Sequence, residues 1–439
     1  MIKKLIQLSY PMIVSRMTVV LLEIVSVFIV ARLDINTLSA YGLAAPLYMT
    51  LYMLTCSFLL VFLVKAAQLF NDKERFSRYF SASVWISLML SVVVIVLILA
   101  CGALLPLLGQ SKNISGIADQ FFYFIVFGMP PLYLSSVLSQ TLIIFEKTHF
   151  VSISAFLQLL LGAVLVYAFT HFWGWDLKGV ALGFDIAYWT RCLMLMGYIK
   201  FCCAHKVKLV KCNKNDFIED AKFLFRMGWP TSIQYGGELV GASIATLMIG
   251  HFYVYALAAQ QIASQFRIFL IMLPYALSQA TAIMIAKKSK SDIFAYEAHV
   301  RQVMKSAFYL GMTIIALLVF PINIFSGVYI HLFIANGPPA VTHLAKIFIV
   351  ITSIALFFDM AKYLLSGALR GMHSTKGTML SSIIGYCLIG TLLAALIGYY
   401  FKGGPVGIRI GMLIGLAISV CITARYFSSF MKKMKIVGT

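Results

Sequence analysis

Four acidic residues stand inside long apolar stretches of this 439-residue sequence: Glu23, Asp185, Glu238 and Asp359. A charged side chain at the centre of a bilayer costs roughly 3 kcal/mol on insertion scales. Such a carboxyl group is tolerated when it faces a water-filled cavity, pairs with a cation or takes up a proton. Its oxygens can also bind a small hard cation. These residue types therefore indicate proton or cation binding within a membrane.

Glu238 is the strongest candidate for this chemistry. It follows Gln234, Tyr235 and two glycines, and Gly241-Ala242-Ser243 comes about one helical turn later. Small residues let helices approach closely or leave a cavity beside the carboxylate. No lysine or arginine stands within one turn to neutralise the charge. We predict that Glu238 binds a cation or a proton; the alternative is a structural hydrogen bond between helices.

Asp359 has a lysine, Lys362, three residues later on the same face of a helix. A pair at this spacing can be a purely structural ion pair. Lys362 can also compete with an incoming cation and hold the site closed until that cation arrives. We predict Asp359 as the second cation-binding carboxylate, and the structural pair stays open as the alternative.

Glu23 and Asp185 each have an arginine nearby in the sequence. Arg16 precedes Glu23 by seven residues on the same helix face, so a structural pair and cation binding are equally open there. Asp185 lies toward the end of its apolar stretch with Arg191 close by, which favours a structural pair. We keep Glu23 as the third candidate for the cation site.

The stretches that hold these residues are transmembrane helices by composition and length. Hydrophobic residues make up 61% of the chain and charged residues 11%, whereas a soluble domain is nearer half apolar and a quarter charged. A helix needs about 20 apolar residues to cross a bilayer, and the period-2 alternation of barrel strands is absent. The sequence predicts an all-α membrane protein with twelve transmembrane helices, near residues 7–30, 43–69, 80–107, 118–145, 151–172, 179–201, 221–250, 255–285, 304–331, 344–369, 377–400 and 406–430.

Lysine and arginine are concentrated in alternate loops between these helices. The net charge is +20, and the alternation is the pattern of the positive-inside rule rather than of a nucleic-acid-binding face. Both termini are therefore predicted to be cytoplasmic. The longest basic connection divides the chain into predicted units 1–205 and 221–439, with 206–220 as a cytoplasmic linker. The basic loops lie near residues 3–4, 73–78, 206–214, 287–290, 370–376 and 432–435.

Two stretches of the chain match without a gap at a spacing of 219 residues, half its length. This spacing predicts two six-helix bundles related as an internal repeat, and duplicated halves of one orientation typically hold a substrate between them. Chance similarity between two apolar helices is the alternative. The aligned pairs are Pro11 with Pro230, Leu38 with Leu257, Ala40 with Ala259 and Ala44 with Ala263.

Other classes of protein lack their sequence signatures here. HExxH, nucleophile-elbow and phosphate-loop motifs are absent, and the eight cysteines show no metal spacing. The sequence therefore predicts no enzyme, no metal centre and no cofactor. A channel is disfavoured because the scattered carboxylates form no ring or filter.

Four segments of the second half form a recognisable set: Gly228-Trp229-Pro230 followed by Glu238, Leu257 to Ala263, Leu277 to Ala280, and Asp359 followed by 367–371. Together they resemble the seventh, eighth and tenth helices of the multidrug and toxin extrusion (MATE) transporters. Residues 11–44 are similar to the opening segment of the same family. The resemblance covers the whole chain and implies twelve helices in two six-helix halves.

The resemblance also implies antiport, in which a cationic drug or metabolite leaves as sodium ions or protons enter. It implies that Glu238 and Asp359 are the cation-site carboxylates of the C-terminal half. Two departures bear on ion binding. Ser26 stands where the family has an aspartate, so an N-terminal proton site would move to Glu23, and Lys362 is an added cation.

We therefore predict a monomeric multidrug efflux antiporter of the bacterial inner or plasma membrane, with its cationic small-molecule substrate in a cleft between the halves. The coupling ion is sodium or a proton, because a carboxylate serves both. The side chains predicted to line the cleft are Gln234, Tyr235, Gln260 and Lys362. The alternative is a lipid-linked saccharide flippase of related architecture, whose pyrophosphate would be bound by Arg16, Arg191 and Arg267.

Overall fold

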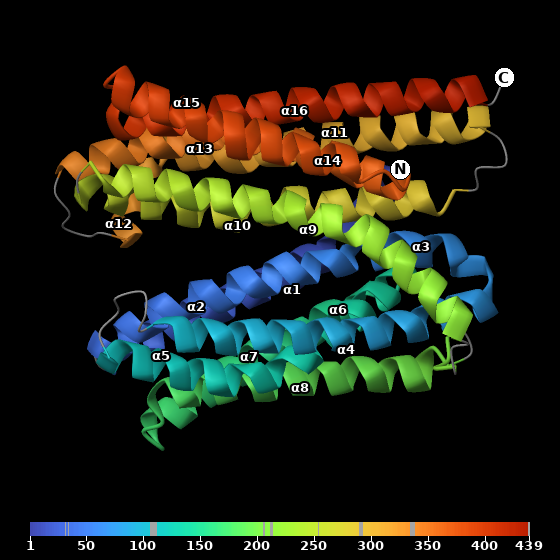
Figure 1. Cartoon of the computed structure of the whole chain (residues 1–439), viewed down its shortest axis with the longest axis horizontal. Helices are drawn as coiled ribbons and strands as arrows, with labels where there is room; N and C mark the ends of the chain where they lie inside the picture. The colour runs from blue at the N-terminus through green and yellow to red at the C-terminus, as the bar shows by residue number, and fades with distance from the viewer. Residues whose placement is uncertain are drawn as a thin grey trace. The chain divides into compact units, whose positions relative to one another are not determined.

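The computed structural model describes most of the chain, and every regular element in it is a helix (Figure 1). The predicted all-α class is confirmed for this part of the chain. Parts of two of the basic loops lie outside the described residues, including Lys206, Lys211 and Lys290. The described residues are 1–30, 32–33, 35–105, 112–204, 207–210, 214–252, 254–288, 293–333 and 339–437.

Six membrane-spanning segments make up the N-terminal half, and two of them are interrupted. The second and fourth segments change from α-helix to short 3₁₀ turns and back, whereas the others are continuous α-helices. The elements are α1 (Ile2–Val30), α2 (Ile35–Cys56) with η1 (Ser57–Val61), α3 (Phe62–Gln68) and η2 (Leu69–Asn71), α4 (Lys73–Leu104), α5 (Lys112–Ile125) with η4 (Val126–Gly128) and α6 (Met129–Ile144), α7 (Thr148–His171) and α8 (Asp176–Cys202).

The C-terminal half contains six more segments and one short helix. Its fifth segment is unusual, because two stretches of it are wound as π-helix, a form that is rare and frequent at functional sites. The elements are α9 (Lys214–Gly250), α10 (Val254–Ala286), α11 (Ile293–Ile324), the short α12 (Ser326–Phe333), α13 (Pro339–Gly371), α14 (Lys376–Ser381) with η5 (Ser382–Gly390), α15 (Thr391–Ala395) and η6 (Leu396–Tyr400), and α16 (Gly404–Val437).

Ten of the described helical segments are long and apolar enough to cross a membrane. The two further predicted spans, α8 and α9, are continuous helices as well, and their hydropathy is lowered by charged residues such as Asp185, Arg191 and Glu238. Together they give the twelve-helix architecture. The ninth span was misplaced by the sequence: the helix occupies Ile293–Ile324 instead of 304–331, because its first turns are helical but polar.

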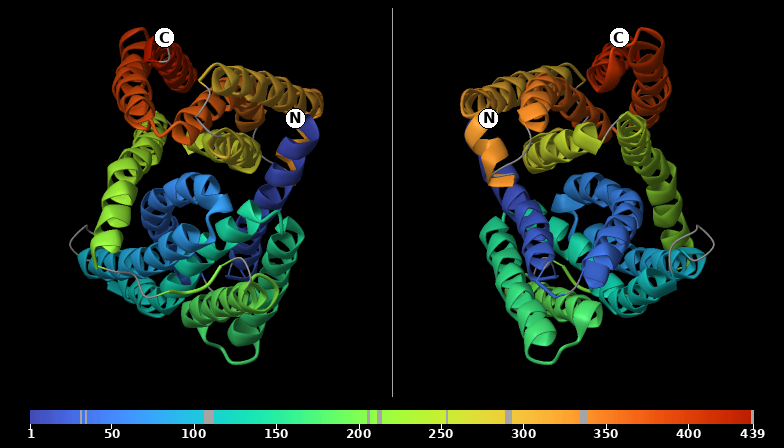
Figure 2. Two further views of the ribbon diagram at one scale, coloured as in Figure 1. Left: turned by 90° about the vertical axis from the view of Figure 1, so that its right-hand side faces the viewer. Right: turned by 90° about the vertical axis from the view of Figure 1, so that its left-hand side faces the viewer.

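Contacts group the chain into two compact units, Tyr10–Gly228 and Met1–Ser9 with Trp229–Thr439. Helix α9 begins at Lys214 and so includes part of the predicted linker 206–220. The division into 1–205, 206–220 and 221–439 stays a prediction. Within the second unit α10 and α13 pack together extensively, and α16 runs along η5 and α13 (Figure 2).

Glycines set the close contact between η5 and α16. A Cβ atom at Gly385 would overlap the backbone of Ser419, and one at Gly415 would overlap the backbone of Gly390. Small residues of this kind let membrane helices pack backbone to backbone. This packing holds η5, which carries Ser382 of the candidate site, closely against α16.

The residues that defined the sequence repeat occupy matching environments. Ala40 and Ala44 on α2 are completely buried, and so are Ala259 and Ala263 on α10. Pro11 and Pro230 both stand inside long helices, α1 and α9. A proline inside a helix removes one backbone hydrogen bond and bends the helix. The repeat is therefore a repeat of packing as well as of residue types.

Candidate functional site

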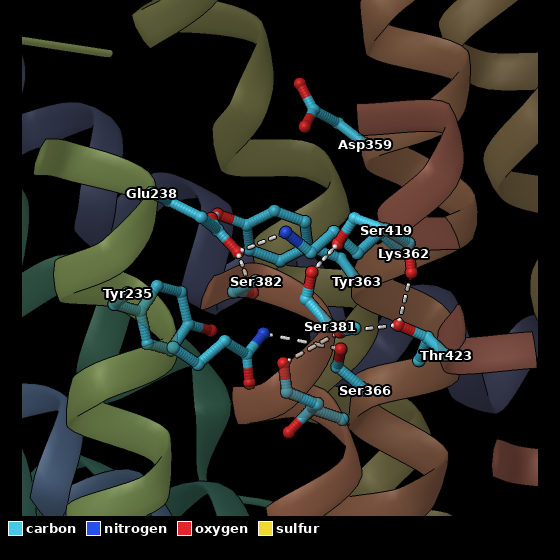
Figure 3. A network of polar contacts seen from close by, with 12 residues as sticks. Tyr235, Glu238, Asp359, Lys362, Tyr363, Ser366, Ser381, Ser382, Ser419 and Thr423 are labelled. Atoms are coloured by element: carbon cyan, nitrogen blue, oxygen red, sulfur yellow. Dashed lines mark hydrogen bonds and ion pairs between the residues drawn. The ribbon is translucent and has the colours of Figure 1, made fainter. Parts of the chain in front are cut away.

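Glu238 is held by three side chains of the C-terminal half (Figure 3). Lys362 Nζ lies 2.9 Å from Glu238 Oε1. The hydroxyl of Tyr363 donates to Oε2 at 3.1 Å, and Ser382 Oγ donates to Oε1 at 3.2 Å. The Lys362 side chain is only 1% exposed and that of Glu238 is 13% exposed. A charge on either side chain is therefore compensated by the other within a nearly dry environment.

The elements around Glu238 explain this arrangement. Lys362 and Tyr363 are neighbours on α13, and Ser382 is the first residue of the π-helical η5. Lys362 Nζ also lies 5.5 Å from the ring centroid of Tyr386, a cation–π distance. A Cβ atom at Gly241 would come within 3.0 Å of the Tyr386 ring, so the small residues after Glu238 let this ring approach.

The start of η5 is anchored by α16. Thr423 Oγ1 donates to Ser381 Oγ and Ser419 Oγ donates to the Ser381 carbonyl, both at 2.8 Å (Figure 3). Ser382 is the next residue, so its hydroxyl approaches Glu238 from a backbone that is already fixed. The hydroxyls of Ser382 and Tyr363 are oxygen donors of the kind that a small cation binds together with a carboxylate.

Asp359 pairs with Arg267 on α10, not with Lys362 on its own helix. Arg267 Nε donates to Oδ2 at 3.1 Å, and Nη2 donates to Oδ1 at 3.1 Å and to Oδ2 at 2.9 Å. The in-helix pair considered from the sequence therefore does not form, and Figure 3 shows Asp359 apart from the Glu238–Lys362 pair. Packing of α10 on α13 decides the partner, which spacing along one helix could not reveal.

The predicted cleft residues divide into two groups. Gln234 and Tyr235 lie on α9 close to Glu238: Gln234 Nε2 donates to Ser366 Oγ at 3.3 Å, and the Tyr235 ring centroid is 6.0 Å from that of Tyr363. Gln260 instead donates through Nε2 to Thr246 Oγ1 at 3.1 Å and lines a separate cavity. Lys362 joins the first group through its contact with Glu238.

Glu23 lies in the N-terminal half and has a different environment. Its Oε1 atom is buried without a hydrogen-bond partner, and among the described residues no cation pairs with it. Arg16 Nη1 approaches the sulfur of Met53 at 4.0 Å, so the structural Arg16–Glu23 pair does not form.

Asp185 on α8 is buried, and neither of its carboxylate oxygens has a hydrogen-bond partner within the described residues. Arg191 turns to neutral groups instead: it donates to Gln158 Oε1 at 3.0 Å and to Ser15 Oγ at 2.7 Å. The structural Asp185–Arg191 pair that the sequence favoured is therefore wrong. Asp185 and Arg191 therefore lie on the same helix, α8, without forming an ion pair.

Comparison with known proteins agrees with this geometry. The MatE family model matches residues 11–168 and 230–396. The chain belongs to the MATE family. The two matches begin 219 residues apart, which is the spacing of the sequence repeat. The protein is accordingly a membrane transporter built from two repeats, and it is not an enzyme.

Relatives of similar length support the assignment. The chain is 24% identical to the probable multidrug resistance protein NorM of Synechococcus sp., with 95% of this chain and 92% of the relative covered. It is also 24% identical to the probable NorM of Bacillus subtilis, with 95% and 93% covered. The crystal structure of the Vibrio cholerae MATE transporter VcmN in the bent form matches with a TM-score of 0.86 at 16% identity, covering 99% of this chain and 98% of that one.

Proposed function

We propose that this MATE transporter is a secondary antiporter that exports a cationic small molecule in exchange for sodium ions or protons. The observation that carries the proposal is the Glu238–Lys362 pair: a carboxylate in a membrane helix is neutralised by a lysine of the same half at 2.9 Å. Lys362 occupies the position that an incoming cation would take. The names of the relatives describe multidrug resistance, which favours a drug as cargo.

Displacement of Lys362 is the central step of the proposed exchange. A proton that enters neutralises Glu238 and removes the attraction between the two side chains. A sodium ion that enters takes the carboxylate oxygens together with the hydroxyl oxygens of Tyr363 and Ser382. In either case the ammonium of Lys362 is released beside the cargo site and repels a bound cation. Ion entry and cargo binding are then coupled by differential stabilisation of two states.

Asp359 is the second carboxylate of the proposed cation site, and its partner Arg267 is harder to displace than Lys362. Arg267 occupies both of its oxygens, and bidentate pairs of this kind are stronger than single contacts. We assign to Glu238 the first contact with the entering ion and to Asp359 a contact made after Arg267 moves. Neutralisation of Arg267 by Asp359 also leaves less positive charge for the pyrophosphate of a saccharide lipid, which argues against the flippase alternative.

A second site for proton binding is proposed at Glu23. A buried carboxylate without a cation partner is stable only when a proton or a cation neutralises it. Glu23 is such a carboxylate, and Asp185 of the same half also has buried oxygens without a hydrogen-bond partner among the described residues. The energy available depends on the charges that cross. Exchange of one monovalent ion for one monovalent cargo is electroneutral, and each extra entering charge adds about 2.3 kcal/mol per 100 mV.

The proposed setting is a bacterial inner or plasma membrane, with a monomeric protein and both termini in the cytoplasm. The lysine-rich loops and the positive-inside rule support this orientation. The membrane potential of such a membrane is negative inside, so it assists net entry of positive charge.

Dye transport in proteoliposomes tests the proposal. Ethidium-loaded vesicles receive a sodium gradient or a pH gradient separately, with wild type, Glu238→Gln and the control Glu219→Gln side by side. Glu219 lies on the same helix but is exposed, so the same chemical change there should leave transport intact. We expect one gradient to drive transport and Glu238→Gln to abolish it. Transport that survives in Glu238→Gln would move the coupling site to Asp359 or Glu23.

A further inference from the structure

A cavity of about 240 Å³ lies within the C-terminal half, and its lining includes Arg267, the partner of Asp359, and Tyr386, whose ring lies near Lys362. Residues of α9, α10, α13, η5 and α16 line it, and most of the lining is apolar, including Leu239, Ile271 and Leu416. An engineered cavity of roughly 150 Å³ already admits benzene. The space is therefore large enough for an organic ring. The lining residues with polar side-chain atoms are Thr246, Gln260, Ser264, Arg267, Thr352, Tyr386 and Arg409.

Arg409 on α16 is the chemically distinctive member of this lining. Its Nη1 atom donates to Thr352 Oγ1 at 3.2 Å, and its guanidinium carbon lies 5.0 Å from the ring centroid of Phe348. Its Nε and Nη2 atoms are buried and have no hydrogen-bond partner among the described residues. Buried polar groups are nearly always hydrogen-bonded, so two orphaned donors on one guanidinium require a partner.

The charges of this half leave Arg409 without a counter-ion. Glu238 is neutralised by Lys362, and Asp359 is neutralised by Arg267. Among the described residues no carboxylate pairs with Arg409, which therefore contributes an excess positive charge inside the half. A buried charge is stable only when it is paired, so an anion from outside the chain is the group that this cavity lacks.

The two free donors also indicate the shape of that anion. Arg267 holds Asp359 through its Nε and Nη2 atoms, which form one edge of the guanidinium. The free atoms of Arg409 form that same edge. This edge matches the two oxygens of a carboxylate bidentately, in a way that a spherical halide cannot.

We propose that the cavity binds a small organic carboxylate, with its two oxygens on the Nε and Nη2 edge of Arg409 and its apolar body among Leu239, Ile271 and Leu416. This ligand is an anion, whereas the coupling ion and cargo of the proposed exchange are cations. Neither Glu238 nor Lys362 lines the cavity, so binding of a carboxylate there does not depend on whether Glu238 couples transport to an ion.

Direct binding of benzoate to the purified full-length protein in detergent tests the site. Isothermal titration with sodium benzoate is compared with sodium chloride at equal ionic strength, for wild type, Arg409→Gln and Lys402→Gln. We expect saturable benzoate binding that Arg409→Gln weakens on the order of tenfold or more. Lys402→Gln removes the same charge from an exposed residue near the start of α16 and should leave the affinity unchanged.

A second variant keeps the test decisive if Arg409→Gln fails to fold. Ala242→Leu keeps every charge and places extra volume in the cavity, so it should exclude benzoate while the protein stays folded. Three results would overturn the proposal: no saturable benzoate binding to wild type, benzoate binding that both Arg409→Gln and Ala242→Leu retain, or chloride binding as strong as benzoate binding. The last result would assign the orphaned donors to a halide instead of a carboxylate.

Discussion

Buried carboxyl groups of the two halves differ in how their charge is balanced. In the C-terminal half Glu238 has Lys362 and Asp359 has Arg267. In the N-terminal half Glu23 has no cation partner among the described residues, although the half contains a buried arginine. In the proposed exchange, the difference corresponds to two ways of binding an ion. The C-terminal half releases a built-in cation before it accepts another, whereas the N-terminal half accepts a proton or cation directly.

The built-in cations have an energetic consequence that the N-terminal half does not share. Removing one partner of a buried ion pair leaves an uncompensated charge, which destabilises a protein by about 3–5 kcal/mol. Removing an unpaired carboxylate leaves no orphaned partner. Substitutions that neutralise acids should therefore lower the free energy of unfolding more in the C-terminal half than in the N-terminal half. The loss should be largest for the pair that is most buried and has the most hydrogen bonds.

The largest loss of stability is expected for Asp359→Asn. Arg267 would keep its charge without a carboxylate that now accepts three hydrogen-bond contacts. We expect a loss of about 3–5 kcal/mol in the free energy of unfolding, measured by denaturant titration in detergent.

Asp216→Asn is the matched control for this change. Asp216 pairs with Arg78 at 3.0 Å, but both side chains are at least a third exposed. An exposed pair contributes about 0–1 kcal/mol. Equal losses for the two variants would show that the Arg267–Asp359 pair is screened by solvent and is not a buried pair.

A smaller loss, about 2 kcal/mol, is expected for Lys362→Met. Glu238 would lose its cation but keep the hydroxyls of Tyr363 and Ser382. Added sodium or a lower pH should then restore the thermal midpoint, because either one neutralises the orphaned carboxylate. The measurement is the midpoint as a function of sodium concentration and of pH. Lys305→Met, an exposed residue on α11, serves as control and should show neither response.

Tyr363→Phe should have a still smaller effect. It removes one hydrogen bond to Glu238 Oε2, 3.1 Å long, and leaves the ion pair in place. A hydrogen bond to a charged group contributes about 1.5–3 kcal/mol, and residual exposure of Glu238 places the expected loss near the lower value. Tyr309→Phe, at a side chain that is 69% exposed, is the matched control. A loss as large as that of Lys362→Met would make the hydroxyl, not the lysine, the principal partner of Glu238.

Sequence alone predicted the architecture because its signals are local. Apolar length marks each span, and the offset between Pro11 and Pro230 reveals the repeat without any knowledge of packing. Helix ends were less accurate where polar turns extend a helix beyond its apolar run, as in α9 and α11. The π-helical winding of η5 left no signal in the residues that we could recognise.

The sequence singled out Glu238 and Asp359 as candidates, but it did not predict their partners. Lys362 looks like the partner of Asp359 along the helix and pairs with Glu238, which is 124 positions away. Arg267 was considered only as a phosphate ligand. Partner choice depends on how α9, α10 and α13 are rotated and aligned, which is tertiary information. A usable signal did exist: a lone arginine in an apolar stretch needs an acid, and few acids were available.

The smallest change in stability is expected for Glu23→Gln, and it is the sharpest test of the difference between the halves. The carboxyl group has no cation to orphan, so the uncharged amide should alter the free energy of unfolding by no more than about 1 kcal/mol. The same substitution at Glu238 leaves Lys362 buried without a counter-ion and should be clearly more damaging. Proton-driven dye transport should nevertheless be impaired in Glu23→Gln, because an amide cannot exchange a proton. Comparison of the two variants by denaturant titration and by transport in the same vesicles separates the effects. A large loss of stability in Glu23→Gln would mean that this half, too, balances its acid with a cation, and the contrast between the halves would fail.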